Sequence, residues 1–243
     1  MSKNTRFRVI AGMVGAFASV VVATSAVAQE ATPLIYGVQI DELEYRFGDA
    51  SDVMAWNGNA TIGRDELKFR LLSQGEYARR SDTLETLENQ LLVQTPISDF
   101  FDAKAGVRFD IPAGPDRTYG VLGIQGLAPL WFDIDADLFL SEDGNGSARI
   151  DAEYEMLITN QITLVPSVEF NVAFADDREI GIGSGLSSTE MGLRLSYDLV
   201  DRSVAPYAGV FYERSFGETA DLAKEEGEDQ DALFFLTGVR LMF

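Results

Sequence analysis

The chain ends on a segment, residues 232–243, in which apolar and more polar positions alternate. One parity holds Leu233, Phe235, Thr237, Val239, Leu241 and Phe243, and the other holds Gly238, Arg240 and Met242. This period of two predicts a strand with one apolar face. Terminal residues of soluble proteins are usually frayed and polar, whereas the last strand of an outer-membrane barrel must pair with the first to close the sheet. We therefore expect Leu241 and Phe243 to be needed for barrel closure.

Eleven further segments show the same alternation, which brings the predicted number of strands to about twelve. An even number of strands, joined alternately by longer loops and tight turns, is typical of bacterial outer-membrane barrels, whereas a soluble sandwich has no reason for that regularity. The sequence therefore predicts an all-β protein, an antiparallel transmembrane β-barrel over residues 34–243 with no helical domain. The eleven segments lie at about residues 34–47, 56–62, 67–71, 87–93, 101–109, 117–126, 132–138, 148–154, 162–172, 190–199 and 208–212. The predicted connections include a polar loop at 75–82 and an acidic loop at 217–231.

The N-terminal segment has the composition of a secretory signal peptide. A basic start at residues 3–8 is followed by an apolar run at 9–23 and by a small-residue cleavage site, A-V-A, at 26–28. A transmembrane anchor would need a longer apolar run of about 20 residues. We therefore expect residues 1–28 to be removed and residues 29–33 to form a short segment before the barrel.

Composition narrows the classes of partner and chemistry. With 19 Lys and Arg against 39 Asp and Glu, the formal net charge is −20. A protein this acidic attracts cations and is not expected to bind nucleic acid or anionic lipid by general electrostatics. The chain has no Cys and no His, which excludes disulfides, thiolate metal sites and imidazole ligands.

Acidic side chains gather on the parity that must face the lumen, because a charged side chain on the lipid face costs about 2–4 kcal/mol at the membrane midplane. Two interpretations are open: an ion-paired polar filling of a narrow barrel, or a cation-attracting path or site like the carboxylate rings of cation pores. The predicted acidic patch, with Arg149 near it, consists of Asp133, Asp135, Asp137, Asp151, Glu153, Glu155 and Glu169, and positive charge lies on other strands at Lys68, Arg70, Lys104, Arg108 and Arg194.

No catalytic constellation emerges from the sequence. The barrel hydrolases and proteases that could be considered use a His as general base, and no carboxylate pair is singled out by its spacing as an acid and base. Residues 181–185 read G-I-G-S-G, but they lie in a predicted flexible loop with no following helix, so nucleotide binding is not indicated. We expect the protein not to be an enzyme.

Several long motifs span the predicted barrel: L-E-Y-R-F-G-D (43–49), W-N-G-N-A (56–60), A-G-V-R-F-D (105–110), R-T-Y-G-V-L-G-I-Q-G-L-A-P-L-W-F (117–132), L-F-L-S-E-D-G (138–144), A-R-I-D-A-E-Y-E (148–155), and the stretches 181–198 and 205–221. Together they resemble the copper resistance protein B family of outer-membrane proteins, over essentially all of residues 34–243. The resemblance implies an outer-membrane protein of copper homeostasis that acts in sequestration or efflux of periplasmic copper.

The soft ligands that copper prefers are scarce in this chain. Copper(I) in particular favours thioether, thiolate and imidazole groups, and parity places Met54, Met156 and Met191 on the lipid face. Met242 points inward near the periplasmic mouth. Family members often carry a Met- and His-rich segment before the barrel, and in this chain residues 29–33 occupy that position. We therefore expect weak Cu(II) coordination by the lumen carboxylates, with copper specificity supplied by a periplasmic copper-carrying protein. The alternative is a narrow cation-preferring channel or a closed structural barrel without copper specificity.

Overall fold

The described part of the chain forms one closed antiparallel sheet. The computed structural model describes residues 33–48, 52–111, 115–200, 202–227 and 229–243, and the predicted signal peptide lies outside these ranges. Neighbouring strands pair in chain order, and β1 also pairs with β13, so the sheet closes on itself. The strands are β1 (Ile35–Gly48), β2 (Asp52–Arg64), β3 (Leu67–Ala78), β4 (Thr83–Pro96), β5 (Phe101–Asp110), β6 (Arg117–Ala128), β7 (Phe132–Ser141), β8 (Gly146–Tyr154), β9 (Met156–Leu157), β10 (Ile162–Ala173), β11 (Gly185–Tyr197), β12 (Val204–Ser215) and β13 (Asp231–Met242).

Two of these segments, β8 and β9, together form one strand of the barrel. The short β9 follows β8 after Glu155, and both lie against β10. The thirteen segments of the described residues therefore form a closed barrel of twelve strands. The predicted fold class and the predicted number of strands are confirmed.

The outer face of the barrel is apolar, as the alternation predicts. On β13, Leu233 and Phe235 are exposed while Phe234 and Leu236 are buried. The same alternation exposes apolar side chains on the other strands, and it turns Met191 outward as expected. Because a closed sheet pairs its own backbone groups, it can stand in lipid where an open sheet edge cannot. The architecture is therefore that of a transmembrane barrel.

β1 changes face at a bulge centred on Asp41. Ile40 pairs with Gly58 of β2 and Glu42 pairs with the next residue, Asn57, so Asp41 has no partner in the register. An extra residue reverses the alternation that follows it. The bulge allows apolar side chains on both halves of β1 to face lipid, and it turns Glu42 and the following charged residues into the lumen.

The connections differ from the sequence-based expectations in three places. The acidic segment 217–231 was expected to be a loop, but it contains helix α2 (Gly217–Glu226), which is rich in good helix formers and ends at Gly227 with a φ of 83°. The strict alternation of loop lengths is also wrong, since the connection 79–82 is no longer than the turn 97–100. Finally, β3 continues to Ala78 through residues that were interpreted as a polar loop.

Long connections remain a property of one end of the barrel. The connections 174–184, which includes the 3-10 helix η3 (Arg178–Ile180), and 216–230 lie at the end opposite Phe243. Bacterial barrels place short turns in the periplasm and long loops outside the cell, so the end that carries Phe243 is the periplasmic one. In the part of the chain that the structure describes, no helix is both long and apolar enough to cross a membrane.

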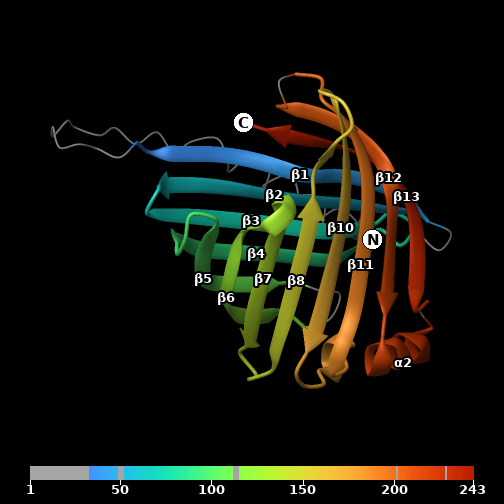
Figure 1. Ribbon diagram of the computed structural model, residues 1–243. Coiled ribbons are helices and arrows are strands. Elements are labelled where there is room, and N and C mark those ends of the chain that lie inside the picture. The colour runs from blue at the N-terminus through green and yellow to red at the C-terminus, as the bar shows by residue number, and fades with distance from the viewer. Residues whose placement is uncertain (1–32, 49–51, 112–114, 201, 228) are drawn as a thin grey trace, which may run out of the picture. The chain divides into compact units, whose positions relative to one another are not determined.

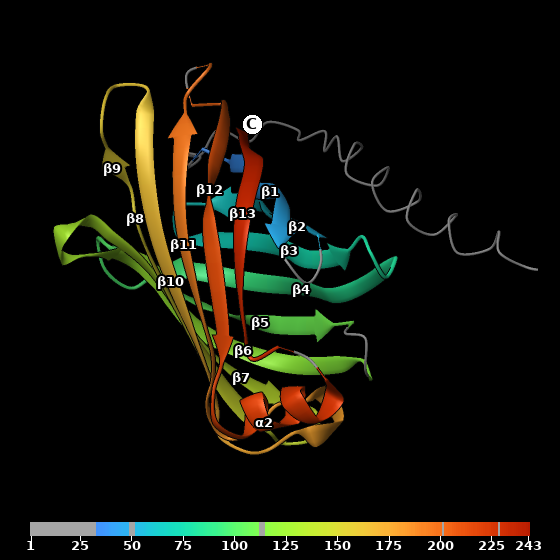
Figure 2. The same ribbon diagram turned by 90° about the vertical axis from the view of Figure 1, so that its right-hand side faces the viewer.

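The strands coil strongly about the barrel. In Figure 1 the strands β1 to β4 lie across the view while β8, β10 and β11 run nearly upright. This change of direction follows from the right-handed twist that accumulates between neighbouring strands. Figure 2 shows α2 at the end of β12, on the long-loop side.

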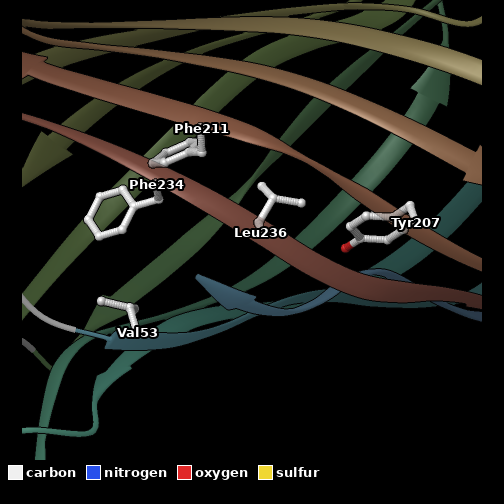
Figure 3. Close-up of a cluster of buried hydrophobic side chains, with 5 residues drawn as sticks. All are labelled: Val53, Tyr207, Phe211, Phe234 and Leu236. Carbon is white, nitrogen blue, oxygen red and sulfur yellow. The ribbon is translucent and has the colours of Figure 1, made fainter. Parts of the chain in front are cut away.

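Two apolar clusters lie on the lumen side of the barrel wall, which the alternation did not predict. The first contains Phe211 of β12 and Phe234 of β13 (Figure 3), whose ring centroids are 6.2 Å apart. The inward parity of the closing strand is therefore partly apolar. The first cluster consists of Val53, Tyr207, Phe211, Phe234 and Leu236, and the second of Leu92, Tyr119, Val121 and Phe139.

Candidate functional site in the barrel lumen

Six carboxylates form a row across the inner face of the barrel, which we call the carboxylate row. Most members lie directly opposite the next member across a strand pair, for example Glu190 opposite both Glu169 and Glu213. Like charges that lie directly opposite one another destabilise a sheet, so the row needs positive charge nearby. Its members are Asp102 (β5), Asp135 (β7), Asp151 (β8), Glu169 (β10), Glu190 (β11) and Glu213 (β12), with Gln125 (β6) between the first two.

The protein supplies a basic partner to half of the carboxylate row. Within the described ranges, the side chains of Asp151, Glu190 and Glu213 make no ion pair and no hydrogen bond. These three carboxylates can therefore be neutralised by mutation without leaving a basic side chain unpaired. The matched members are Asp102 with Lys68 (3.0 Å), Asp135 with Lys104 (2.5 Å) and Glu169 with Arg149 (3.3 Å), measured between nitrogen and oxygen.

A further carboxylate faces the row from the opposite wall. Glu76 of β3 lies near enough to Glu190 and Glu213 to repel both electrostatically. Its own partner is Arg46, whose Nη1 lies 2.6 Å from Glu76 Oε1. Carboxylates thus approach one another from both sides of the lumen, as they do in the acidic rings of cation pores.

Among the half-buried charged side chains of the lumen, acidic ones outnumber basic ones, while charges of both signs are buried, Glu44 and Asp137 as well as Lys104 and Arg46. Lys104 exposes 1% of its side chain and Arg46 exposes 6%, although Lys68 exposes 26%. Glu76 and Glu153 each expose 31%. Because the accessible lining is mainly acidic, it concentrates cations and repels anions.

One group of buried charges ties β1 to β11 inside the barrel. Glu44, whose side chain is fully buried, accepts from Arg194 Nε at 2.6 Å and from Arg46 Nε at 2.9 Å. The Arg46 guanidinium also lies 3.9 Å from the centroid of the Phe211 ring. Both arginines therefore form their ion pairs inside the barrel, where Glu44 and its neighbours neutralise their positive charge.

A second group ties β8 to β4 and β5, and Glu88 lies at its centre. Arg108 Nη2 approaches Glu88 Oε2 at 2.7 Å, and Arg149 donates to both Glu88 oxygens at 3.1 Å. Arg108 also pairs with Asp110, and its guanidinium lies 4.6 Å from the centroid of the Phe139 ring. Since β5, β6 and β7 separate β4 from β8 in the sheet, the Arg149–Glu88 pair crosses part of the lumen.

Gly123 of β6 provides the space for a third ion pair. Lys104 Nζ lies 2.9 Å from Asp137 Oδ2, and both side chains pass over Gly123. A Cβ atom at this position would lie 1.9 Å from Asp137 Oδ1 and 2.9 Å from Lys104 Cε. The close approach of these two charged side chains therefore depends on the absence of a side chain at residue 123.

Replacing Gly123 by alanine is expected to lower the free energy of unfolding by about 1–3 kcal/mol, the usual cost of overpacking. The added methyl group must push Asp137 away from Lys104, which is almost completely buried. Urea titration of the barrel in lipid vesicles measures the loss. Gly120→Ala on the same strand is the matched control, because its Cβ would meet nothing closer than Leu140 O at 4.0 Å. Equal stability of the two variants would contradict this account.

The periplasmic end of the lumen carries its own cross-barrel contact. Arg240 of β13 reaches Glu153 at 3.3 Å and Glu155 at 3.0 Å. Asp133 is exposed close to this mouth, directly opposite Glu153. Met242 lies on the inward parity and is 44% exposed. The periplasmic mouth is therefore acidic, with one thioether beside it.

The loops at the other end are held by charge and by hydrogen bonds to α2. The predicted loop at residues 181–185 is confirmed to have no following helix, but the Gly183 backbone N–H donates to Thr219 Oγ1 of α2 at 3.0 Å. Hydrogen bonds from the side chain and the backbone N–H of Ser184 hold the pKa of Asp176 below its ordinary value. The glycine-rich segment is thus a pinned connection, and its role is structural.

The structure brings together part of the predicted acidic patch. Asp135, Asp151 and Glu169 belong to the carboxylate row, whereas Asp137 is buried against Lys104. Glu153, Glu155 and Asp133 lie at the periplasmic mouth. The predicted patch is therefore divided between the middle of the lumen and its mouth.

Sequence reasoning left several carboxylates of the lumen out of the patch, among them Asp102, Glu190 and Glu213 of the carboxylate row and Glu76 opposite it. Glu190 lies on the inward parity of a predicted strand, and that parity was a sufficient signal to include it. Glu213 lies one residue beyond the predicted strand 208–212, which the structure extends to Ser215. Glu76 was hidden because its segment was interpreted as a loop. The register across β10, β11 and β12, which no sequence pattern gives, is what joins these residues to the others.

The described residues do not form a preorganised metal site. In the ranges that the structure covers, no three side chains of the His, Cys, Asp and Glu type come close enough together to hold a metal ion. Met54 and Met191 face outward, so neither contributes to the lumen.

Comparison with known proteins gives the family. Among solved structures, that of NanC porin has a TM-score of 0.51 at 13% identity, covering 85% of this chain and 99% of the porin, and this likeness shows the fold alone. Among curated proteins, Copper resistance protein B of Escherichia coli is 39% identical over 208 residues, covering 86% of this chain and 69% of the relative. Copper resistance protein B homolog of Pseudomonas syringae pv. tomato is 37% identical over 203 residues, covering 84% and 68%.

The family model described as Copper resistance protein B precursor matches residues 34–243, which is the whole predicted barrel. A barrel of this family with an apolar outer face is located in the bacterial outer membrane. Neither the family nor the fold is a known enzyme class. With the family model matched over the entire barrel and two relatives above one-third identity, the chain belongs to the copper resistance protein B family.

Proposed function

We propose that the protein moves or transiently holds copper ions in its lumen, as a cation-selective path across the outer membrane. The observation that carries the proposal is the excess of acidic over basic side chains in the lumen, where three carboxylates have no ion-pair partner among the described residues. The basic groups Arg46, Lys104 and Arg194 are held in ion pairs inside the barrel. The carboxylates Asp151, Glu190 and Glu213 have no such partner among the described residues. A path lined in this way favours cations by electrostatics alone.

The three unpaired members of the carboxylate row strengthen this proposal. Asp151, Glu190 and Glu213 lie beside other carboxylates without a basic partner in the described residues. Like charges that lie directly opposite one another repel, and either a bound proton or a visiting cation relieves that repulsion. Copper ions in the lumen would relieve this repulsion, and their weak attachment would allow them to leave again.

Copper enters the proposal as cargo and not as a resident cofactor. Family membership indicates copper, while the carboxylate lining discriminates little between Cu(II) and other divalent ions. We assign the selectivity for copper to a periplasmic copper-carrying protein that delivers the ion to the acidic mouth near Asp133, Glu155 and Met242. The direction of movement in this proposal is from the periplasm outward.

A closed structural barrel is the second candidate. It is favoured by the ion pairs that cross the lumen, Arg149–Glu88 and Arg240–Glu153, and by the two apolar clusters inside the wall. Such a barrel would stabilise the membrane without conducting ions. Single-channel recording separates the two candidates, because a closed barrel gives no conductance steps.

The triple variant Asp151→Asn, Glu190→Gln, Glu213→Gln tests the proposed path. Wild-type barrels in planar bilayers are expected to show a reversal potential of the sign for cation preference in a salt gradient. The variant is expected to lose most of this preference, because it removes three accessible charges and leaves every ion pair intact. In cells lacking the protein, the variant is expected to restore copper tolerance less well than the wild type.

The matched control is Asp65→Asn, Asp99→Asn, Glu142→Gln, which makes the same change of charge at exposed positions outside the lumen. This control is expected to keep the wild-type cation preference and copper tolerance. Wild-type barrels without conductance would contradict the path and support the closed barrel. Unchanged selectivity in the lumen variant would show that the carboxylate row does not line the path.

A further inference from the structure

The periplasmic rim of the barrel exposes large apolar side chains at nearly every turn. We define the apolar rim as the exposed apolar residues at this end, which come from four turns and from both ends of the described chain. Turns that project into water are normally built from Gly, Pro, Asn, Asp and Ser. The apolar rim consists of Leu34, Tyr36, Ile97, Phe100, Leu130, Trp131, Leu157, Ile158, Leu199, Val200 and Phe243.

The connections at the opposite end have a different composition. In the described parts of those connections, Ile111 and Phe174 are the exposed large apolar residues, and charged residues or glycines fill most other positions, as in residues 79–82 and 142–145. The contrast between the two ends is therefore not a general feature of the loops of this barrel. It distinguishes the surface that surrounds the periplasmic mouth.

The turn between β6 and β7 carries the strongest signal. Leu130 and Trp131, in the 3-10 helix η2 (Pro129–Trp131), both have a φ of 69° and are 78% and 71% exposed. Two consecutive left-handed residues suit a tight hairpin turn, and Asn-Gly is the sequence that adopts this turn without strain. Leucine and tryptophan adopt it at a steric cost. A compensating contact for their exposed side chains would account for this choice of residues.

We propose that the apolar rim is seated in the headgroup region of the periplasmic leaflet, with the Leu130–Trp131 turn as its anchor. The rim is continuous with the apolar outer face, since Phe132 follows Trp131 directly and is itself exposed. Tryptophan is enriched at membrane interfaces, where its amphipathic ring is favoured. Lipid is the occupant because the rim residues come from turns all around the barrel, whereas a docked protein would contact one sector.

The polar residues of the other rim turns are consistent with a rim that lies at the level of the lipid headgroups. The β4–β5 turn has Ser98 and Asp99 between the exposed Ile97 and Phe100, so the polar tip can reach water while its apolar flanks contact lipid. The β4–β5 and β6–β7 turns also lie side by side, because the Leu127 N–H donates to Phe100 O at 2.9 Å. In this arrangement the periplasmic mouth opens at the membrane surface itself.

Fluorescence quenching can test the proposal, because the chain has two tryptophans, Trp56 and Trp131. In the variant Trp56→Phe, Trp131 is the sole reporter. In vesicles whose phospholipids carry bromine near the headgroup, this variant is expected to lose more than half of its emission, and acrylamide in the water is expected to quench it only weakly. Bromine placed deep in the acyl chains is expected to quench it less.

The variant Trp131→Phe is the matched control, since Trp56 packs over Gly75 within the lipid-facing part of β2 and β3. Its emission is expected to be quenched most by the deep bromine. If Trp56→Phe fails to fold, the difference between the wild type and Trp131→Phe reports on the same ring. Quenching of Trp131 by acrylamide to the extent of free tryptophan, with no response to brominated lipid, would overturn the proposal.

Discussion

The double variant Leu241→Asp, Phe243→Asp is expected to be missing from the outer membrane. Phe243 and Val38 exchange two backbone hydrogen bonds, at 2.9 and 3.0 Å, where β13 meets β1. Charges near the membrane interface cost about 0–1 kcal/mol each, but a frayed seam leaves unpaired backbone groups in lipid at several kcal/mol each. Since closure is cooperative along the seam, the expected result is a loss of assembled protein.

Gel migration of outer-membrane fractions with and without heating measures this loss, because a folded barrel migrates differently from the unfolded chain. Met242→Asp is the matched control: it lies between the two mutated positions but on the inward parity. This control is expected to assemble. Normal amounts of heat-modifiable double variant would contradict the role that we assign to the lipid-facing end of β13.

Replacing Glu88 by leucine is expected to lower the free energy of unfolding by about 3 kcal/mol, the lower end of the range for breaking a buried ion pair. Glu88 is 6% exposed and is shared by Arg108 and Arg149. The lower end applies because each arginine keeps a second carboxylate, Asp110 or Glu169. Urea titration of the barrel in lipid vesicles measures the change.

Two further variants test whether unpaired charge causes this loss of stability. Glu142→Leu, at an exposed loop position, is expected to change stability by less than about 0.5 kcal/mol. Leucine at Glu88, Arg108 and Arg149 together is expected to recover much of the loss, because no charge then remains unpaired at this position. A loss in the triple variant as large as that of Glu88→Leu would show that packing, and not the orphaned charge, sets the stability here.

Period-two alternation was sufficient to predict the class of fold and the direction of most side chains. Charged residues such as Lys104 and apolar residues such as Leu193 lie on the expected faces, because lipid penalises charge strongly enough to fix one face of every strand. The same penalty does not act on the lumen side. Inward apolar residues such as Phe234 and Leu236 were therefore not distinguished by the pattern.

Local physics also explains the errors in the connections. The sequence around Ala220 and Leu222 favours a helix by propensity, but an acidic segment between strands was interpreted as a loop, and the structure has α2 there. Glu76 was missed because polar residues that line a lumen resemble loop residues in a single sequence. Neither error changed the predicted fold, because α2 lies outside the sheet and the extra residues of β3 only lengthen a strand that was already predicted.

The sequence by itself determined that this chain is a closed barrel with an acidic interior, since alternation, charge and the apolar last strand each act locally. Only the tertiary structure decided which charges meet. Arg149 reaches Glu88, and Glu190 lies between Glu169 and Glu213, because strand register and closure bring together residues that are far apart in the chain. Register depends on the bulges and on all neighbouring strands at once, so which carboxylates are ion-paired and which have no basic partner is a property of the closed sheet.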